Sequence, residues 1–198
     1  MNLPNKITVG RIILAVFLLI FLAFPFYQIG IDFPSFLAFG KVPINLKYII
    51  AGIIFLVASL SDFLDGYIAR KNNIVTDFGK VMDAIADKIL VNGVLIILAY
   101  DGYISIIIPV VIITRDIVVD SIKMVCGSNG KVVAASIPGK IKTICMMVGL
   151  TLVFFYNLPF ELLNIDVANA LLFVATILSL VSGCQYFLVN KDFILRQK

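Results

Sequence analysis

The sequence predicts an all-α integral membrane protein with six transmembrane helices. Of its 198 residues, 61% are hydrophobic and only 14% are charged, whereas a soluble domain usually carries about 25% charged residues. A water-facing fold of this size has too little interior to hide so much apolar surface. The apolar residues also form runs that approach the roughly 20 residues needed to cross a bilayer. Composition and run length together therefore predict a membrane protein.

The first apolar stretch covers about residues 12–28 and contains no charged residue. It ends in the bulky run Phe24 to Tyr27, which differs from the small-residue cleavage site of a signal peptide, so we expect a retained helix. Ahead of it, Pro4 suits a helix start. Lys6 and Arg11 predict a short N-terminal amphipathic segment that lies on the membrane surface.

The next two stretches, about residues 47–70 and 79–100, have their polar residues at the ends that adjoin in the chain. The turn between them is short, so we expect antiparallel neighbours. The last three stretches cover about residues 105–123, 138–156 and 167–190. The connection from Gly30 to Asn45 is expected to be an outer loop with a short interfacial element. No linker or internal repeat is evident, which favours one membrane-embedded catalytic domain over residues 1–198.

Basic residues distribute unequally between the two sides of such a bundle. The loops on one side hold Lys41 and Lys47 and the acids Asp101, Glu161 and Asp166. The other side receives twelve cations: Lys6, Arg11, Arg70, Lys71, Lys80, Lys123, Lys131, Lys140, Lys142, Lys191, Arg196 and Lys198. Basic loops stay in the cytoplasm, so we expect a plasma-membrane protein with both termini cytoplasmic.

Two residue types narrow the chemistry. The chain has no histidine, which excludes a histidine base, a Ser-His-Asp triad and a histidine-ligated zinc site. Cys126, Cys145 and Cys184 form no CxxC motif, and we interpret them as packing residues.

Four aspartates lie within or beside apolar helices, where ionisable residues are costly and usually functional. Asp62 and Asp65 are three residues apart and share one helix face, and Asp83 and Asp87 are four apart and share a face of the next helix. A single acid beside a lysine would indicate a simple ion pair. Two paired sets on adjacent antiparallel helices instead predict one acidic site at the cytoplasmic end.

Four carboxylates in one pocket require positive charge to stay ionised. Oxygen-only ligands favour hard cations, so we expect Mg²⁺ or Mn²⁺. Two such ions about 4 Å apart would clamp a phosphoryl group. Gly66 and Gly79 allow close approach of a backbone or a diphosphate, and Arg70 suits a phosphate oxygen.

These residues resemble the CDP-alcohol phosphotransferase family. The segment from Asp62 to Asp87 matches the pattern D-x2-D-G-x2-A-R-x8-G-x3-D-x3-D at all eight fixed positions: Asp62, Asp65, Gly66, Ala69, Arg70, Gly79, Asp83 and Asp87. The resemblance implies that family's fold, with six helices and cytoplasmic termini. NLPNKITVGR, TRDIVVDSIK and GKIKT further resemble the bacterial phosphatidylglycerophosphate synthase branch, which joins CDP-diacylglycerol to glycerol 3-phosphate and releases CMP.

The resemblance also implies roles for the motif residues. Asp62, Asp65 and Asp83 would be metal ligands shared with the diphosphate. Asp87 would complete the metal site and act as the general base on the acceptor hydroxyl, and with no histidine present a carboxylate is the plausible base. Asp62 would also contribute to a CDP-lipid pocket that is shaped by Gly66, Ala69, Arg70 and Gly79. A homodimer is expected from the resemblance alone, and no nucleic-acid partner is expected.

A phosphorylated acceptor needs cations of its own. Arg115 lies in an otherwise apolar helix, and Lys140 and Lys142 precede the fifth, so these three are candidates for the acceptor phosphate. Asn5, Thr8 and Arg11 would add contacts if the N-terminal segment folds over the pocket. The structural alternative for Arg115 is an ion pair with Asp116 or Asp120. For the two lysines it is an ordinary cytoplasmic loop that carries positive charge.

The chain departs from the synthase pattern at several positions. Ala84 and Ile85 stand where Pro and Leu are usual, Asp116 and Lys123 where Glu and Arg are usual, and Asp120 is an additional acid. Because the last three changes fall near the predicted acceptor pocket, other acceptors remain open: phosphatidylglycerol for cardiolipin, serine or an inositol phosphate. A cation transporter is a more distant alternative, which the position of all four acids at one face disfavours.

Overall fold

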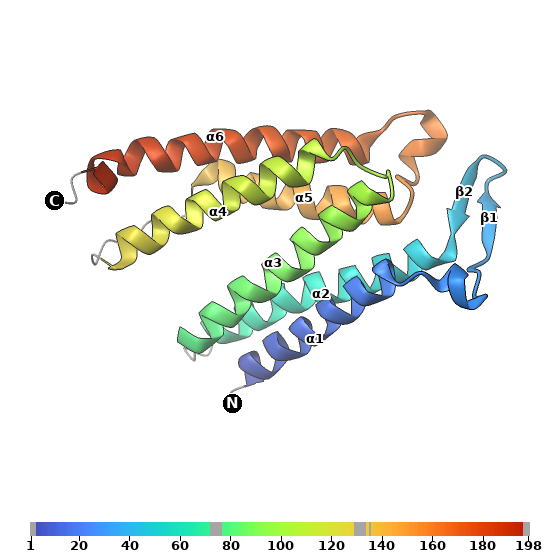
Figure 1. Cartoon of the computed structure of the whole chain (residues 1–198), viewed down its shortest axis with the longest axis horizontal. Coiled ribbons are helices and arrows are strands. Elements are labelled where there is room, and N and C mark those ends of the chain that lie inside the picture. The colour runs from blue at the N-terminus through green and yellow to red at the C-terminus, as the bar shows by residue number, and fades with distance from the viewer. Residues whose placement is uncertain (1–2, 72–76, 129–133, 135, 196–198) are drawn as a thin grey trace.

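The computed structural model describes residues 3–71, 77–128, 134 and 136–195. This part of the chain is mostly helical, with six α-helices (Figure 1): α1 Leu3–Ala23, α2 Leu46–Lys71, α3 Asp77–Tyr100, α4 Ile107–Ser128, α5 Ile137–Phe154 and α6 Val167–Leu195. Two short 3₁₀ helices, η1 Phe26–Ile29 and η2 Phe160–Leu163, lie in connections. The second to sixth predicted stretches match α2 to α6 to within a few residues.

The N-terminus differs from its prediction. A separate amphipathic segment on the membrane surface is wrong, because α1 runs unbroken from Leu3 to Ala23. Asn5, Thr8 and Arg11 recur at helical spacing on one face, and all three are buried. Their polar groups therefore face the interior of the bundle rather than the lipid headgroups.

The connection between α1 and α2 is also more ordered than a loop. Strands β1 Ser35–Ala38 and β2 Val42–Asn45 form an antiparallel hairpin in which Ser35 pairs with Asn45 and Ala38 with Val42. Val42 and Ile44 are buried and Pro43 between them is exposed, the alternation of a one-sided strand. Phe39 and Gly40 have positive φ angles of 52° and 68°, which tight hairpin turns require.

The six helices pack as two groups, α1 to α3 and α4 to α6, which separate toward the end that holds both termini (Figure 1). The groups meet nearer the hairpin end, where the rings of Phe55 (α2) and Phe154 (α5) lie 5.5 Å apart. Gly52 permits this approach, because a Cβ there would lie 2.7 Å from the Cβ of Phe154. Tyr48 and Tyr103 extend the junction, with ring centroids 4.5 Å apart.

The core and the outer surface are both apolar. Buried side chains from all six helices form one cluster that includes Leu18, Phe55, Leu98, Ile112, Leu150, Phe154 and Leu172. Large apolar side chains such as Ile13, Phe17 and Ile20 of α1 face outward. A continuous apolar exterior is expected of a protein surrounded by lipid.

Length and composition support three membrane-crossing stretches in the described residues: Asn5–Ala23, Ile137–Phe154 and Val167–Lys191. The six predicted crossings are therefore supported only in part. Of the other helices, α3 and α4 have spanning length but carry charged residues of the candidate site, such as Asp83 and Asp87 in α3 and Arg115 and Asp116 in α4. These charges interrupt their apolar runs.

Candidate active site

An acidic cluster forms where α1, α2 and α3 meet. Arg11 of α1 is 2% exposed, and its guanidinium pairs with Asp62 of α2 and Asp83 of α3. The two carboxylates keep 40% and 45% of their side-chain surface exposed. Arg11 thus neutralises part of the acidic charge from the buried side, while the carboxylates remain open to a ligand.

The motif residues are placed in part. Asp62 and Gly66 lie in the last three turns of α2, and Gly79, Asp83 and Asp87 lie in the first three turns of α3. The side chains of Asp65, Ala69 and Arg70 fall outside the described residues. The short connection that the sequence predicted to make α2 and α3 neighbours also falls outside them.

The donor chemistry of this cluster fits a hard divalent cation, because carboxylate oxygens are the ligands that Mg²⁺ and Mn²⁺ prefer. Within the described side chains, no group of three or more His, Cys, Asp or Glu residues is arranged to hold a metal ion. Of the four predicted acids, Asp62 and Asp83 lie together, because both pair with the Arg11 guanidinium.

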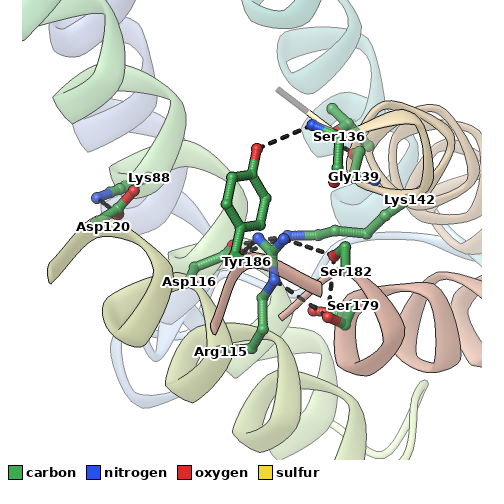
Figure 2. Close-up of polar contacts among 11 residues, drawn as sticks. Lys88, Arg115, Asp116, Asp120, Ser136, Gly139, Lys142, Ser179, Ser182 and Tyr186 are labelled. Atoms are coloured by element: carbon green, nitrogen blue, oxygen red, sulfur yellow. Dashed lines mark hydrogen bonds and ion pairs between the residues drawn. The ribbon is translucent and has the colours of Figure 1, made fainter. Parts of the chain in front are cut away.

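A polar cavity of about 270 Å³ lies between α3, α4, α5 and α6 (Figure 2). Its described lining contains five cationic and three acidic side chains, an excess of two positive charges: Lys88, Arg115, Lys123, Lys140 and Lys142, with Asp87, Asp116 and Asp120. The cavity thus suits a small dianion such as a phosphate monoester.

Asp87 connects the two regions. It lines the cavity and lies four residues after Asp83 on α3, one helical turn from the acidic cluster. One short stretch of α3 therefore contributes a carboxylate to each region.

Arg115 is held mainly by α6. Its Nε donates to the carbonyl oxygen of Ser179 at 3.1 Å, and its two terminal nitrogens donate to Ser182 Oγ at 2.5 Å and Asp116 Oδ1 at 2.8 Å. Gly183 makes room for the side chain, since a Cβ there would lie 3.0 Å from Cγ of Arg115. These bonds use three of the five N–H donors of the guanidinium and fix its plane at the cavity.

Lys142 depends on a different partner. The residue is 4% exposed, and its Nζ donates to both Oδ1 and Oδ2 of Asp116 at 2.8 Å (Figure 2). Asp116 therefore accepts hydrogen bonds from both Arg115 and Lys142. The ion pair between Arg115 and Asp116, which the sequence left open as an alternative, is present.

Tyr186 of α6 supports the entry to α5. Its hydroxyl accepts from the backbone N–H of Ser136 and donates to the carbonyl oxygen of Ala134, each at 3.0 Å. The Arg115 guanidinium lies 5.6 Å from the ring centroid and the Lys123 ammonium 5.4 Å. One aromatic side chain thus contacts two of the cations and positions the segment that carries Lys142.

The acceptor residues predicted from the sequence divide between the two regions. Arg115, Lys140 and Lys142 all line the cavity. Arg11 instead lies on the acidic cluster, and Asn5 and Thr8 are buried in the same first turns of α1. Asp116 was predicted only as an ion-pair partner of Arg115 and as a departure from the family pattern near the pocket, and Lys88 and Tyr186 were not predicted as site residues. Nothing in the sequence links Tyr186 to residues some fifty positions earlier.

The family match is decided by comparison with known proteins. Residues 1–181 match the model of the CDP-alcohol phosphatidyltransferase family. The chain belongs to the CDP-alcohol phosphatidyltransferase family.

Relatives in this family cover almost the whole chain. A Bacillus subtilis protein named CDP-diacylglycerol–glycerol-3-phosphate 3-phosphatidyltransferase is 41% identical over 190 residues, 96% of this chain and 95% of its own length. Proteins of the same name from Rickettsia bellii and Haemophilus influenzae are 32% and 33% identical, and the matches cover 97% and 98% of this chain and 97% and 96% of their own lengths. Every motif residue falls within the family match, and so does every described lining residue of the cavity except Tyr186.

Proposed function

We propose that this enzyme transfers the phosphatidyl group of CDP-diacylglycerol to glycerol 3-phosphate, giving phosphatidylglycerophosphate and CMP in phospholipid synthesis. The observation that carries the proposal is the position of Asp87, between an acidic cluster and a cavity with excess positive charge. The first region suits a cation-bound diphosphate, and the second suits an acceptor with its own phosphate. The names and coverage of the relatives support the same reaction.

The CDP-lipid is proposed to bind at the α2–α3 motif. Asp62, Asp65, Asp83 and Asp87 would hold two Mg²⁺ or Mn²⁺ ions, which when bound stabilise negative charge on the diphosphate. Gly66, Ala69, Arg70 and Gly79 would shape the nucleotide pocket, where the two glycines let the diphosphate approach the backbone. The acyl chains would stay in the surrounding lipid, against the apolar outer faces of the helices.

The acceptor is proposed to bind in the cavity, with its phosphate held by Arg115, Lys142 and Lys140. Asp87 then removes the proton of the acceptor hydroxyl. The hydroxyl oxygen forms a bond to the β-phosphorus of CDP-diacylglycerol, and the bond from that phosphorus to the bridging oxygen of CMP breaks. CMP leaves with the electron pair, so no covalent enzyme intermediate is required.

The membrane arrangement follows from the same proposal. All six helices would cross or enter the bilayer, with the termini, the acidic cluster and the cavity on the cytoplasmic side, where the substrates are. The basic residues near the termini favour this orientation. A homodimer remains the expectation from the family.

Product analysis with purified protein tests the proposal. The protein in detergent would receive CDP-diacylglycerol, Mg²⁺ and one acceptor: glycerol 3-phosphate, glycerol, serine, inositol phosphate or phosphatidylglycerol. We expect mass spectrometry to find phosphatidylglycerophosphate and CMP with glycerol 3-phosphate. CMP release with serine or phosphatidylglycerol, but not with glycerol 3-phosphate, would overturn the proposed identity of the acceptor. The absence of CMP release with every alcohol would overturn the proposed reaction.

A further inference from the structure

Two aspartates of α4 line the same cavity in different ways. Asp116 is bound by Lys142 and Arg115 and has 22% of its side chain exposed. Asp120, one turn later, pairs with Lys88 at the rim, where the two side chains are 39% and 48% exposed. The two acids carry the same charge, but only Asp116 contacts cations deep in the cavity (Figure 2).

The two cations that Asp116 contacts depend on it unequally. Arg115 has two further bonds to α6, at Ser179 and Ser182. Within the described residues, both hydrogen bonds that the Lys142 ammonium donates go to Asp116. A lysine side chain has about 2 kcal/mol of rotamer entropy to lose on fixation, and a buried ammonium without a counter-ion is strongly destabilising. Asp116 therefore accounts for the position of Lys142 in a way that it does not for Arg115.

We propose that Asp116 is a positioning residue for the acceptor, which acts by holding the Lys142 ammonium where the acceptor's phosphate binds. This inference rests on the proposed function and deepens it. Fixing the ammonium in advance removes an entropic cost from substrate binding. The cavity thereby binds an anion more tightly with a negative residue in its wall than without it.

The direction in which Asp116→Asn changes the KM for glycerol 3-phosphate separates positioning from a purely electrostatic effect. If Asp116 contributed only its charge, Asp116→Asn would remove repulsion and lower the KM for glycerol 3-phosphate. Positioning predicts the opposite: a KM for glycerol 3-phosphate raised about tenfold, the size of one charge-assisted hydrogen bond. The KM for CDP-diacylglycerol should stay within about twofold of wild type, because the ion pairs of Asp116 are with Arg115 and Lys142 and the acidic cluster pairs instead with Arg11.

Two variants serve as matched controls in the same kinetic measurement. Asp120→Asn removes an equal charge from the same cavity and should leave the glycerol 3-phosphate KM unchanged or slightly lower. Asp116→Glu keeps a carboxylate for Lys142 and should recover most of the lost affinity. A lowered glycerol 3-phosphate KM in Asp116→Asn, or equal changes for both substrates, would overturn the inference.

A double-mutant cycle with Lys142→Met keeps the test decisive if Asp116→Asn alone folds poorly, because the double variant removes the buried ion pair as a whole. In the Lys142→Met background, Asp116→Asn should raise the glycerol 3-phosphate KM no further. A second tenfold rise there would show that Asp116 acts independently of Lys142 and would overturn the inference.

A binding measurement distinguishes failure of the inference from failure of the proposed function. Calorimetric titration of the purified full chain with glycerol 3-phosphate needs no turnover. Weaker binding to Asp116→Asn than to wild type supports positioning even if another acceptor proves to be the substrate. Equal or tighter binding to the variant would overturn it even if glycerol 3-phosphate is the substrate.

Discussion

The proposed reaction depends on Asp87, which lines the cavity and lies one helical turn after Asp83 of the acidic cluster. Replacing it with asparagine keeps the size and polarity of the side chain and removes its capacity to accept a proton. We expect Asp87→Asn to lower CMP release by about 100-fold or more, the usual contribution of a general base, while CDP-diacylglycerol still binds.

Asp120→Asn is the matched control for that measurement, because it removes the same charge from the wall of the same cavity. Its turnover should stay within a few-fold of wild type. Wild-type rates in Asp87→Asn would exclude Asp87 as the base, and equal losses in both variants would assign the effect to the charge of the cavity.

Tyr186 offers a second test at the residue scale. Tyr186→Phe keeps the ring beside Arg115 and Lys123 but removes the hydroxyl that bonds Ser136 and Ala134. We expect a KM for glycerol 3-phosphate raised about fivefold or more, because two hydrogen bonds that fix the start of α5 are lost and each contributes about 1 kcal/mol. Tyr100→Phe, on an 88% exposed side chain, is the control. An unchanged KM with a lowered Tm would give Tyr186 a structural role only.

At the scale of helices, the sequence predicted five of the six with good boundaries, because long apolar runs between charged turns leave little freedom. The first helix was misjudged because Lys6 and Arg11 suggest a surface segment when read alone. Arg11 is buried against Asp62 and Asp83, which are distant in sequence. A short interfacial element was predicted between Gly30 and Asn45, but not that it would be a hairpin, whose strands pair with each other and whose Asn45 N–H donates to the Tyr156 hydroxyl.

The candidate site shows the same division. The motif spacing placed Asp62 and Asp83 on converging helices, and both pair with Arg11. Arg115, Lys140 and Lys142 were predicted to share a pocket, and all three line the cavity. The partners of those residues were not predictable from local sequence. Asp116 meets Lys142 only because α4 and α5 pack against α6, and Tyr186 reaches Ser136 across the same packing.

The contact between the two helix groups gives a prediction for stability. Gly52→Ala places a Cβ 2.7 Å from the Cβ of Phe154, too close without movement of α2 or α5. We expect a loss of about 1–3 kcal/mol in stability, as in other overpacked cores, seen as a lower Tm in detergent. Gly127→Ala, where a new Cβ meets nothing within 4 Å, should keep or raise the Tm. Equal Tm values for Gly52→Ala and wild type would contradict the close packing.

At the scale of the whole molecule, the hairpin and the two termini lie at opposite ends (Figure 1). In a background without Cys126, Cys145 and Cys184, single cysteines at the exposed positions Lys41 and Lys191 should lie on opposite sides of the membrane. We expect an impermeant maleimide to label Lys41→Cys in intact cells and Lys191→Cys only in inverted vesicles, as basic residues near the termini imply. Labelling of both from the same side would contradict the proposed topology.

We propose above that one cavity with excess positive charge recognises the acceptor by its phosphate. The kcat/KM of CMP release for glycerol 3-phosphate against glycerol, measured on the purified protein with CDP-diacylglycerol, tests this recognition. Even two of the three proposed charge-assisted contacts, each of about tenfold, predict a preference of at least about 100-fold for the phosphorylated acceptor. Equal kcat/KM values for the two acceptors would contradict the claim.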